Sequence, residues 1–336
     1  MVIPAERQTK LIFDPGPHKY YDDEGVVYTS VTTLIGKYKK QFNKKYWGMY
    51  TALKNAGYYL RPDMQNEQYI TVDGIRRHIN DLYENPINAK EVELTVKEWQ
   101  RLTDIACERG NVIHNRLENT INQSKGDSSG SSNTQIKPRF SLEGQLKVYK
   151  TKHDLESTGI QHTQPLIYWQ LLHYINKGCT LYAEKKTFST SFQVAGTIDV
   201  LIVKDNRFGI LDWKTNKDPI LFESGYYKKV LSATGEWYKT GQFVGTDNRL
   251  FAPLSHLPDC KGSIYSLQLN TYAYLMIRWG YKLVKNALTI CHMMPGEKPK
   301  LISVPLLLNE VDDLMKHHYR TRVIGNEEGS THFGII

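Results

Sequence analysis

Two aspartates and one lysine in the stretch GTIDVLIVKDNRFGILDWKTNK, residues 196–217, have residue types and a spacing that suit chemistry at a buried site. Asp199 and Asp212 each interrupt an aliphatic run, and Lys214 follows Asp212 by two residues. Two carboxylates about 5 Å apart on adjacent strands repel unless a cation lies between them, and Mg²⁺ or Mn²⁺ selects such oxygen pairs. Lys214 could then hold and deprotonate a nearby water. The alternative is a partly buried ion pair with little net gain in stability.

Two antiparallel strands are the elements that must position these residues. A two-residue turn at Asp205 and Asn206 would pair the strands so that Asp199 lies opposite Asp212. Because side chains on a strand alternate between its faces, Asp212 and Lys214 share a face, and the register places Asp199 there too. The other face would be an apolar core layer consisting of Ile198, Val200, Ile202, Leu211 and Trp213.

Hydrophobic periodicity predicts a mixed α/β (α+β) protein around this hairpin. Residues 11–29 predict an N-terminal hairpin, and Ser30 is a candidate N-cap for a helix that follows it. The remaining expected elements are helices at 95–123, 140–178, 263–280 and 309–323, three strands within 180–217, and a strand pair after residue 286.

Composition limits the classes of protein that fit. The chain has 336 residues, of which 40% are hydrophobic and 23% charged, so it can bury a real core. Its apolar runs are shorter than the roughly 20 residues of a membrane helix, and its start indicates neither export nor organelle import. Four scattered cysteines without a CxxC pair predict reduced thiols in the cytoplasm, with no zinc site or disulfide framework.

Positive charge favours a polyanionic partner. The formal net charge is +8, and lysines alternate with aromatic residues at 36–46 and again within 220–262. Lysines can neutralise phosphates while aromatic rings stack on unpaired bases, so both tracts are candidate surfaces for single-stranded nucleic acid. The alternatives are a solvated helix face at 36–46 and a surface hairpin, stabilised by its own aromatics, at 220–262.

The GTID and LDWK segments together resemble the core motif of the PD-(D/E)XK nuclease superfamily, and further motifs resemble its RecB-like exonuclease branch. These motifs are similar to those of phage-encoded exonucleases and of the mitochondrial genome maintenance exonuclease. They are the helix motif ACERGNVIHNRLE with Gly110, His114 and Glu118, the strand motif LYAEKKTF with Glu184, the QxxxY pair Gln268 and Tyr272, and the helix start VYTSVTTLI with Ser30 and Thr32.

The resemblance implies a restriction-endonuclease-like core, a mixed central sheet flanked by helices, that hydrolyses phosphodiester bonds with one or two Mg²⁺ or Mn²⁺ ions. It implies that Lys214 activates water and offsets transition-state charge, and that Glu184 reaches a second ion or orients a water. The implied ligands are Asp199, Asp212, His114 and the backbone carbonyl of Trp213. Gln268 and Tyr272 would position DNA or brace Lys214; alternatively, they only pack their helix. The candidates for substrate binding or support are Ser30, Thr32, Gly110 and Glu118.

The predicted domains are an N-terminal DNA-guiding region at 1–94 and a nuclease core at 95–336, which contains a flexible loop at 122–138 and an insertion at 220–262. The expected activity is that of a DNA exonuclease acting from single-stranded ends in phage-type replication, recombination or end processing. A structure-specific or restriction-type endonuclease and a non-catalytic DNA-binding accessory protein are the alternatives. No iron–sulfur cluster and no nucleotide cofactor are expected, so a helicase or recombinase would be a partner.

Overall fold

The computed structural model describes residues 3–14, 16–56, 72–122, 148–231 and 237–330. Within these ranges the side chains of residues 72, 109, 111–122, 231, 237 and 323–330 are not described. The predicted flexible loop at 122–138 therefore lies outside the described residues, apart from its first backbone position.

The chain divides into two compact units, Met1–Lys40 with Ile113–Ile336, and Gln41–Val112. The sequence-based boundary at residue 94 falls inside helix α5 (Pro86–Asn122), which contributes to both units. Each unit has its own buried apolar cluster.

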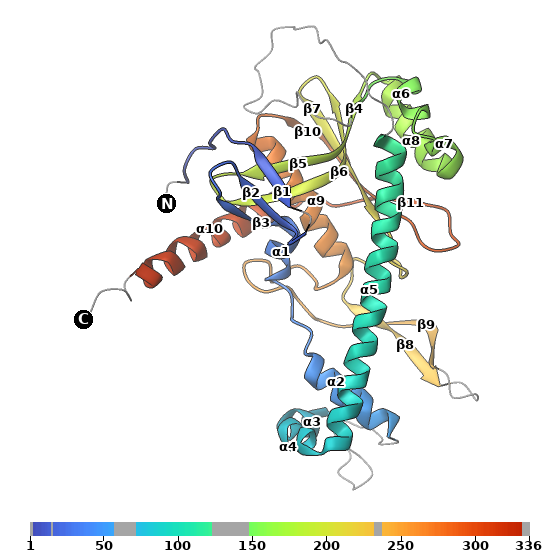
Figure 1. Ribbon diagram of the computed structural model, residues 1–336, viewed down its shortest axis with the longest axis vertical. Helices are drawn as coiled ribbons and strands as arrows, with labels where there is room; N and C mark the ends of the chain where they lie inside the picture. Colours follow the sequence, from blue (N-terminus) through green and yellow to red (C-terminus); the bar gives the residue numbers. More distant parts are fainter. Residues whose placement is uncertain (1–2, 15, 57–71, 123–147, 232–236, 331–336) are drawn as a thin grey trace. The chain divides into compact units, whose positions relative to one another are not determined.

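The larger unit is built on a mixed sheet of nine strands (Figure 1). The strand order is β1-β2-β3-β6-β7-β10-β11, and β5 pairs with both β6 and β4. Strand β10 runs parallel to β7, and β3 runs parallel to the first residues of β6. The strands are β1 Leu11–Asp14, β2 Lys19–Asp22, β3 Val27–Ser30, β4 Val148–Tyr149, β5 Thr180–Ser189, β6 Val194–Lys204, β7 Arg207–Lys214, β10 Lys282–His292 and β11 Lys300–Ser303.

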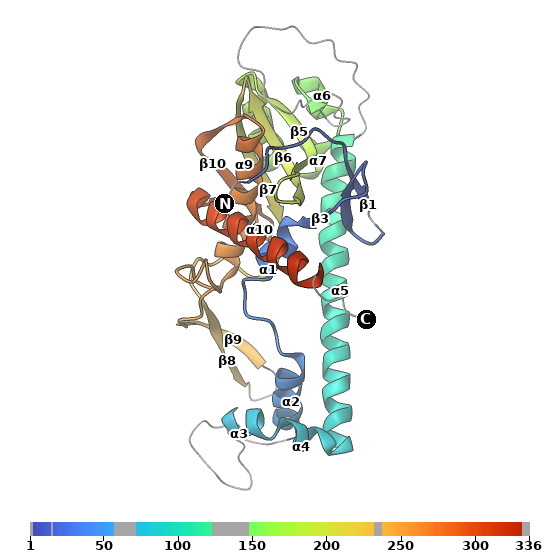
Figure 2. The ribbon, with the colours of Figure 1, turned by 90° about the vertical axis from the view of Figure 1, so that its left-hand side faces the viewer.

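Helices cover both faces of this sheet (Figure 2). Helices α1, α9 and α10 contribute to the apolar cluster on one face, and α6, α7 and α8 contribute to the cluster on the other. These helices are α1 Val31–Gly36, α6 Lys152–Glu156, α7 Ile160–Thr163, α8 Pro165–Asn176, α9 Lys261–Arg278 and α10 Leu308–Ser330. No helix in the described part of the chain is long and apolar enough to cross a membrane.

The predicted hairpin of β6 and β7 is confirmed. Lys204 lies opposite Arg207 across a turn at 205–206, and the antiparallel register continues to the pair Val200 and Leu211. Asp205 has φ 56, a left-handed conformation that aspartate tolerates better than most residues. A turn of two residues fixes the register of everything that follows it, which is why this part of the sheet was predictable.

The predicted apolar layer is correct for four residues and wrong for Ile198. Val200, Ile202, Leu211 and Trp213 pack together with α8, whereas Ile198 packs in the cluster on the opposite face, with α9. The alternation of faces on β6 breaks between Ile198 and Val200, beside Glu184 of β5, which has φ 51, while the pairs Ala183–Val200 and Lys185–Ile198 on either side keep one register. The strict period-two alternation on which the prediction rested therefore does not extend past Val200.

Other elements differ from the sequence prediction at their ends. The predicted hairpin at 11–29 is a three-stranded antiparallel meander. Helix α5 begins at Pro86 rather than near residue 95, since proline suits a first helical turn. Within the predicted helix at 140–178, residues 140–147 lie outside the described residues, and 148–178 contain strand β4 and three short helices, because Gly159 adopts φ 73 and Pro165 starts a new helix.

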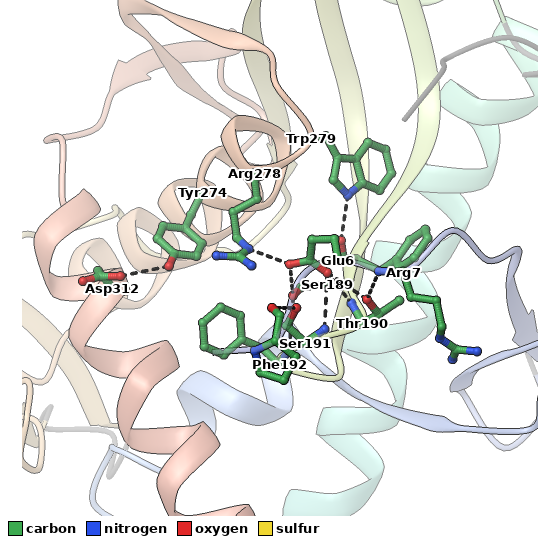
Figure 3. A network of polar contacts seen from close by, with 12 residues as sticks. Glu6, Arg7, Ser189, Thr190, Ser191, Phe192, Tyr274, Arg278, Trp279 and Asp312 are labelled. Carbon is green, nitrogen blue, oxygen red and sulfur yellow. Dashed lines mark hydrogen bonds and ion pairs between the residues drawn. The ribbon is translucent and has the colours of Figure 1, made fainter. Parts of the chain in front are cut away.

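A buried glutamate ties the N-terminal segment to the sheet and to α9 (Figure 3). Glu6 accepts hydrogen bonds from Ser189 Oγ and Arg278 Nε, both at 2.6 Å, and from the backbone N–H of Thr190 at 2.8 Å. Burial alone would raise the pKa of Glu6, but donors from Ser189 and Arg278 outweigh it, so the net pKa is lowered. The charged form of Glu6 is therefore part of the folded structure.

The smaller unit contains α2 (Lys44–Asn55), α3 (Val72–Arg77), α4 (Ile79–Glu84) and the first part of α5. Its core is formed by Tyr46, Met49, Ala52, Leu53, Ile75 and Val92. Aromatic residues of the basic tract at 36–46 divide between core and surface, since Tyr46 is buried while Phe42 is 59% exposed.

The tract at 220–262 contains a separate two-stranded antiparallel sheet, formed by β8 (Gly225–Leu231) and β9 (Trp237–Gly245) (Figure 1). Two contacts hold it. Ser224 Oγ lies 2.9 Å from Thr246 Oγ1 at the base of the hairpin, and Lys239 Nζ, from the half of β9 nearer the turn, lies 2.5 Å from Asp218 Oδ1. The hairpin begins eleven residues after Lys214, the last residue of β7, and Asp218 connects the intervening segment to it.

Candidate functional site

The candidate site lies where β6 and β7 separate. Trp213 N–H, which would extend the backbone ladder past the pair Val200 and Leu211, donates instead to Asp199 Oδ2 at 2.7 Å. Asp199 and Asp212 are the residues that follow this last pair in the same register. The side chain of Asp199 thus replaces a strand contact and holds β6 and β7 together just past the end of their paired stretch.

Asp212 and Lys214 form an ion pair on β7. Lys214 Nζ lies 2.5 Å from Asp212 Oδ2, and the two side chains are only 15% and 2% exposed. Asp212 Oδ2 is buried, and the ammonium of Lys214 is the partner that satisfies it; no other described residue donates a hydrogen bond to this oxygen. A buried carboxylate depends on such a partner, because burial without one is costly.

Burial and neighbouring charges shift the pKa values of Asp199 and Lys214. Burial, reinforced by the negative charge of Asp212, raises the pKa of Asp199 well above its usual range. Burial acts to lower the pKa of Lys214, but the carboxylates of Asp212 and Asp199 outweigh it and raise that pKa. One ammonium is therefore shared between two carboxylates, and without a further cation the protonated form of Asp199 is favoured.

Helix α9 covers this cluster and contributes the predicted QxxxY pair. Gln268 Nε2 donates to Tyr272 Oη at 3.0 Å, and both residues are buried. Tyr272 packs on Gly196, where an added Cβ would lie 2.5 Å from the ring atom Cε1 of Tyr272. Burial, with the nearby charge of Asp212, raises the pKa of Tyr272 well above its usual range, so its hydroxyl is a donor and not an anion. The glycine of GTID therefore makes room for the tyrosine of QxxxY.

Glu184 lies beside Asp199 on β5. Its position between the pairs Ala183–Val200 and Lys185–Ile198 places it across from Asp199, and its charge contributes to the raised pKa of Asp199. Its left-handed backbone is a strained conformation for a residue with a side chain, and such strain persists only where the surroundings enforce it.

A divalent ion fits the donor chemistry of Asp199 and Asp212, because the charge of Asp212 raises the pKa of Asp199 and a cation between the two carboxylates would offset that repulsion. Among the described residues, no group of three or more His, Cys, Asp or Glu side chains is placed to hold one ion. The described part thus supplies a pair of carboxylates. The side chains of His114 and Glu118, both in α5, lie outside the described residues.

The other predicted residues have local roles. Ser30 caps α1, since its hydroxyl accepts a hydrogen bond from Thr33 N–H at 3.0 Å, and this confirms the predicted N-cap. Thr32 is exposed in the first turn of that helix, and Gly110 is half-buried within α5. These contacts do not bring Ser30, Thr32 or Gly110 into the carboxylate cluster.

Three residues of the site carried no assigned role in the sequence. The Tyr265 ring lies 4.8 Å from Lys214 Nζ, a cation–π contact. Tyr20 on β2 shares a hydrogen bond of 3.0 Å with Thr197. Burial, with the nearby charges of Glu184 and Asp199, raises the pKa of Tyr20. His292 is buried opposite Lys214 on the parallel strand β10, and its Nε2 donates to the carbonyl of Asn216 at 2.9 Å. Only Tyr265 had a usable signal, its position one turn before Gln268.

No family model, no curated protein and no solved structure matches this chain. The site must therefore be interpreted from its own residues and geometry.

Proposed function

We propose that the protein is a divalent-metal-dependent deoxyribonuclease of the PD-(D/E)XK type, an exonuclease that hydrolyses phosphodiester bonds from single-stranded ends. The observation that carries this proposal is the convergence of Asp199, Asp212 and Lys214 at the separating ends of β6 and β7, beneath α9. The mixed sheet flanked by helices agrees with the restriction-endonuclease-like core that the motifs imply.

Asp199 and Asp212 are the residues that would hold Mg²⁺ or Mn²⁺, and His114 and the backbone carbonyl of Trp213 are the further donors that the sequence motifs imply. The ion would act as a Lewis acid toward the phosphate and favour ionisation of an attacking water. A divalent cation would favour the ionised form of Asp199, so that both carboxylates could serve as ligands.

The remaining residues of the site would bind the phosphate and keep the charged groups oriented. Lys214 places an ammonium where negative charge grows on the phosphate, and the Tyr265 ring and Asp212 hold that ammonium in position. Tyr272 and Gln268 fix each other on α9 and close the site on the side of the helix. Preorganised charges of this kind are more effective in a buried site than in water, because they need no rearrangement during the reaction.

Phage-type replication, recombination or end processing is the setting in which such an enzyme would act, with a helicase or recombinase as a partner. The basic charge of the chain supports a DNA partner.

Digestion of 5′- and 3′-labelled DNA tests the proposal. Linear and circular single strands and a linear duplex are incubated with Mg²⁺ or Mn²⁺, and EDTA is the blank. We expect linear single strands to be shortened from an end and circles to stay intact; cleaved circles would identify an endonuclease. Binding without hydrolysis by the wild-type protein would instead favour the accessory-protein alternative.

Matched variants connect the activity to the site. Asp199→Asn and Lys214→Ala are expected to lower the cleavage rate by at least 100-fold while the circular dichroism spectrum is unchanged. Asp313→Asn, at an exposed carboxylate on α10, is the control and should cleave as the wild type does. Undiminished cleavage by either site variant would contradict the assignment.

A further inference from the structure

The β8–β9 hairpin presents two unequal faces. Tyr226 lies opposite Val244, and Val230 lies opposite Tyr238, so these four side chains share one face. Lys228 lies on the same face of β8, midway between Tyr226 and Val230. Tyr227 lies opposite Phe243 and Lys229 lies opposite Lys239 on the other face.

The face with Tyr227 is occupied by contacts within the hairpin. The rings of Tyr227 and Phe243 lie 5.5 Å apart, and Lys239 Nζ lies 5.9 Å from the centre of the Tyr227 ring. Lys239 also pairs with Asp218, four residues after the end of β7. This face therefore stabilises the hairpin and connects it to the segment that follows β7.

The face with Tyr226 exposes its aromatic rings. Tyr226 is 58% exposed and Tyr238 is 54% exposed, and no ring contact or hydrogen bond engages either side chain within the described residues. The two positions are four residues apart along the strand direction, which corresponds to about 13 Å. Exposed Lys228 lies between them and is not part of an ion pair within that described portion.

The lysine charges and the tyrosine rings together indicate which class of ligand this face would bind. The sequence of β8 and β9 contains three lysines and no acidic residue. Lysine ammonium groups neutralise phosphates, and tyrosine rings stack on bases only where the bases are unpaired. A duplex hides its base faces and would leave both rings unused, so the surface fits a single strand better than a double strand.

We infer that the β8–β9 face formed by Tyr226, Lys228 and Tyr238 binds single-stranded DNA by stacking on its bases and contacting its phosphate backbone. The inference rests on the proposed nuclease function, since it assigns the substrate class of that enzyme to particular residues. The hairpin starts eleven residues after Lys214, and its Lys239 pairs with Asp218, four residues after the end of β7, so a strand bound on the hairpin would lie near the segment that leaves the site.

Binding is measured separately from cleavage to test this inference. Fluorescence anisotropy with a labelled single-stranded oligonucleotide is performed on the full chain in EDTA, with the matching duplex in parallel. We expect Tyr226→Ala and Tyr238→Ala each to weaken single-strand binding about fivefold or more, with little change for the duplex. Lys228→Gln should reduce the salt dependence of binding by about one phosphate contact.

Control variants separate recognition from folding. Tyr226→Phe and Tyr238→Phe keep the rings and should bind as the wild type does, because stacking does not need the hydroxyl. Trp169→Ala removes a ring that is 63% exposed on α8, away from the hairpin, and should leave binding unchanged. Equal loss in the alanine and phenylalanine variants would indicate a structural role and overturn the inference.

The two proposals fail in different ways. If the wild type cleaves DNA with Mn²⁺ but the alanine variants bind single strands normally, the hairpin inference is wrong and the nuclease stands. If no DNA is cleaved but the alanine variants lose single-strand binding while the phenylalanine variants keep it, the nuclease proposal fails and the binding surface stands.

Discussion

Gly196 lies against the ring of Tyr272, so strand β6 and helix α9 meet at a position where any larger residue would displace the ring. A Cβ at Gly196 would also lie 3.2 Å from Val31 Cγ2, which shows that α1 closes the same contact. The carboxylates of Asp199 and Asp212 are thereby held at a fixed distance from the helix that covers them.

We predict that Gly196→Ala destabilises the protein by about 1–3 kcal/mol, because the new methyl group forces Tyr272 away from the sheet. Urea unfolding followed by circular dichroism measures the change. Gly36→Ala is the control, since a Cβ there would meet nothing within 4 Å. An equal effect in both variants would show that the close contact with Tyr272 is not what matters.

We predict that Asp199→Asn stabilises the metal-free protein by on the order of 1 kcal/mol, because it removes one of two buried carboxylates that repel. The asparagine oxygen can still accept the hydrogen bond from Trp213 N–H. Thermal unfolding in EDTA measures this effect.

The same experiment with Mn²⁺ added should reverse the order. An ion that binds only the folded wild type raises its Tm. At an ion concentration of 100 times the Kd, the unfolding free energy increases by about 2.7 kcal/mol, whereas the variant has lost a ligand and gains less. Asp313→Asn should respond to Mn²⁺ as the wild type does. A variant that is less stable than the wild type in EDTA would contradict the repulsion argument.

We predict that the protein loses stability in mild acid because of His318 on α10. It is buried, its Nε2 has no hydrogen-bond partner among the described residues, and burial, with Lys37 and Arg322 nearby, lowers its pKa to about 4. The unfolded chain takes up this proton near the ordinary value of 6.5, so stability is complete above pH 6.5 and falls as the pH drops toward 4. Between pH 8 and pH 5 this group should remove about 2 kcal/mol of unfolding free energy.

Urea unfolding at several pH values measures this, with His318→Gln as the variant. Its unfolding free energy should fall less between pH 8 and pH 5 than that of the wild type. His162→Gln, at an exposed histidine on α7, should keep the wild-type slope. Parallel slopes for all three proteins would show that His318 does not control the pH dependence.

The register of β6 and β7 was predictable because local rules decide it. A two-residue turn fixes the pairing, and period-two alternation then assigns Asp212 and Lys214 to one face. The N-cap Ser30 and the extent of α9 follow from equally local signals. Each of these features depends on residues close together in the sequence.

Features that depend on tertiary contacts were not predictable. Ile198 packs on the other face, beside the left-handed Glu184 of β5, and nothing in the sequence of β5 marks that position. The contact of Tyr265 with Lys214 joins residues 51 positions apart and exists only once α9 lies on the sheet. Sequence motifs thus identified the charged centre of the site but not the residues that hold it in place.

Lys229 and Lys239 face each other across the β8–β9 hairpin, and this pair has a consequence for self-association. A two-stranded sheet has two edges whose unpaired backbone groups invite strands from other molecules. Like charges on both strands and the irregular pairing between Tyr227 and Lys229 make these edges poor templates for strand addition. The hairpin can therefore display exposed aromatic rings in a concentrated solution without recruiting copies of itself into a larger sheet.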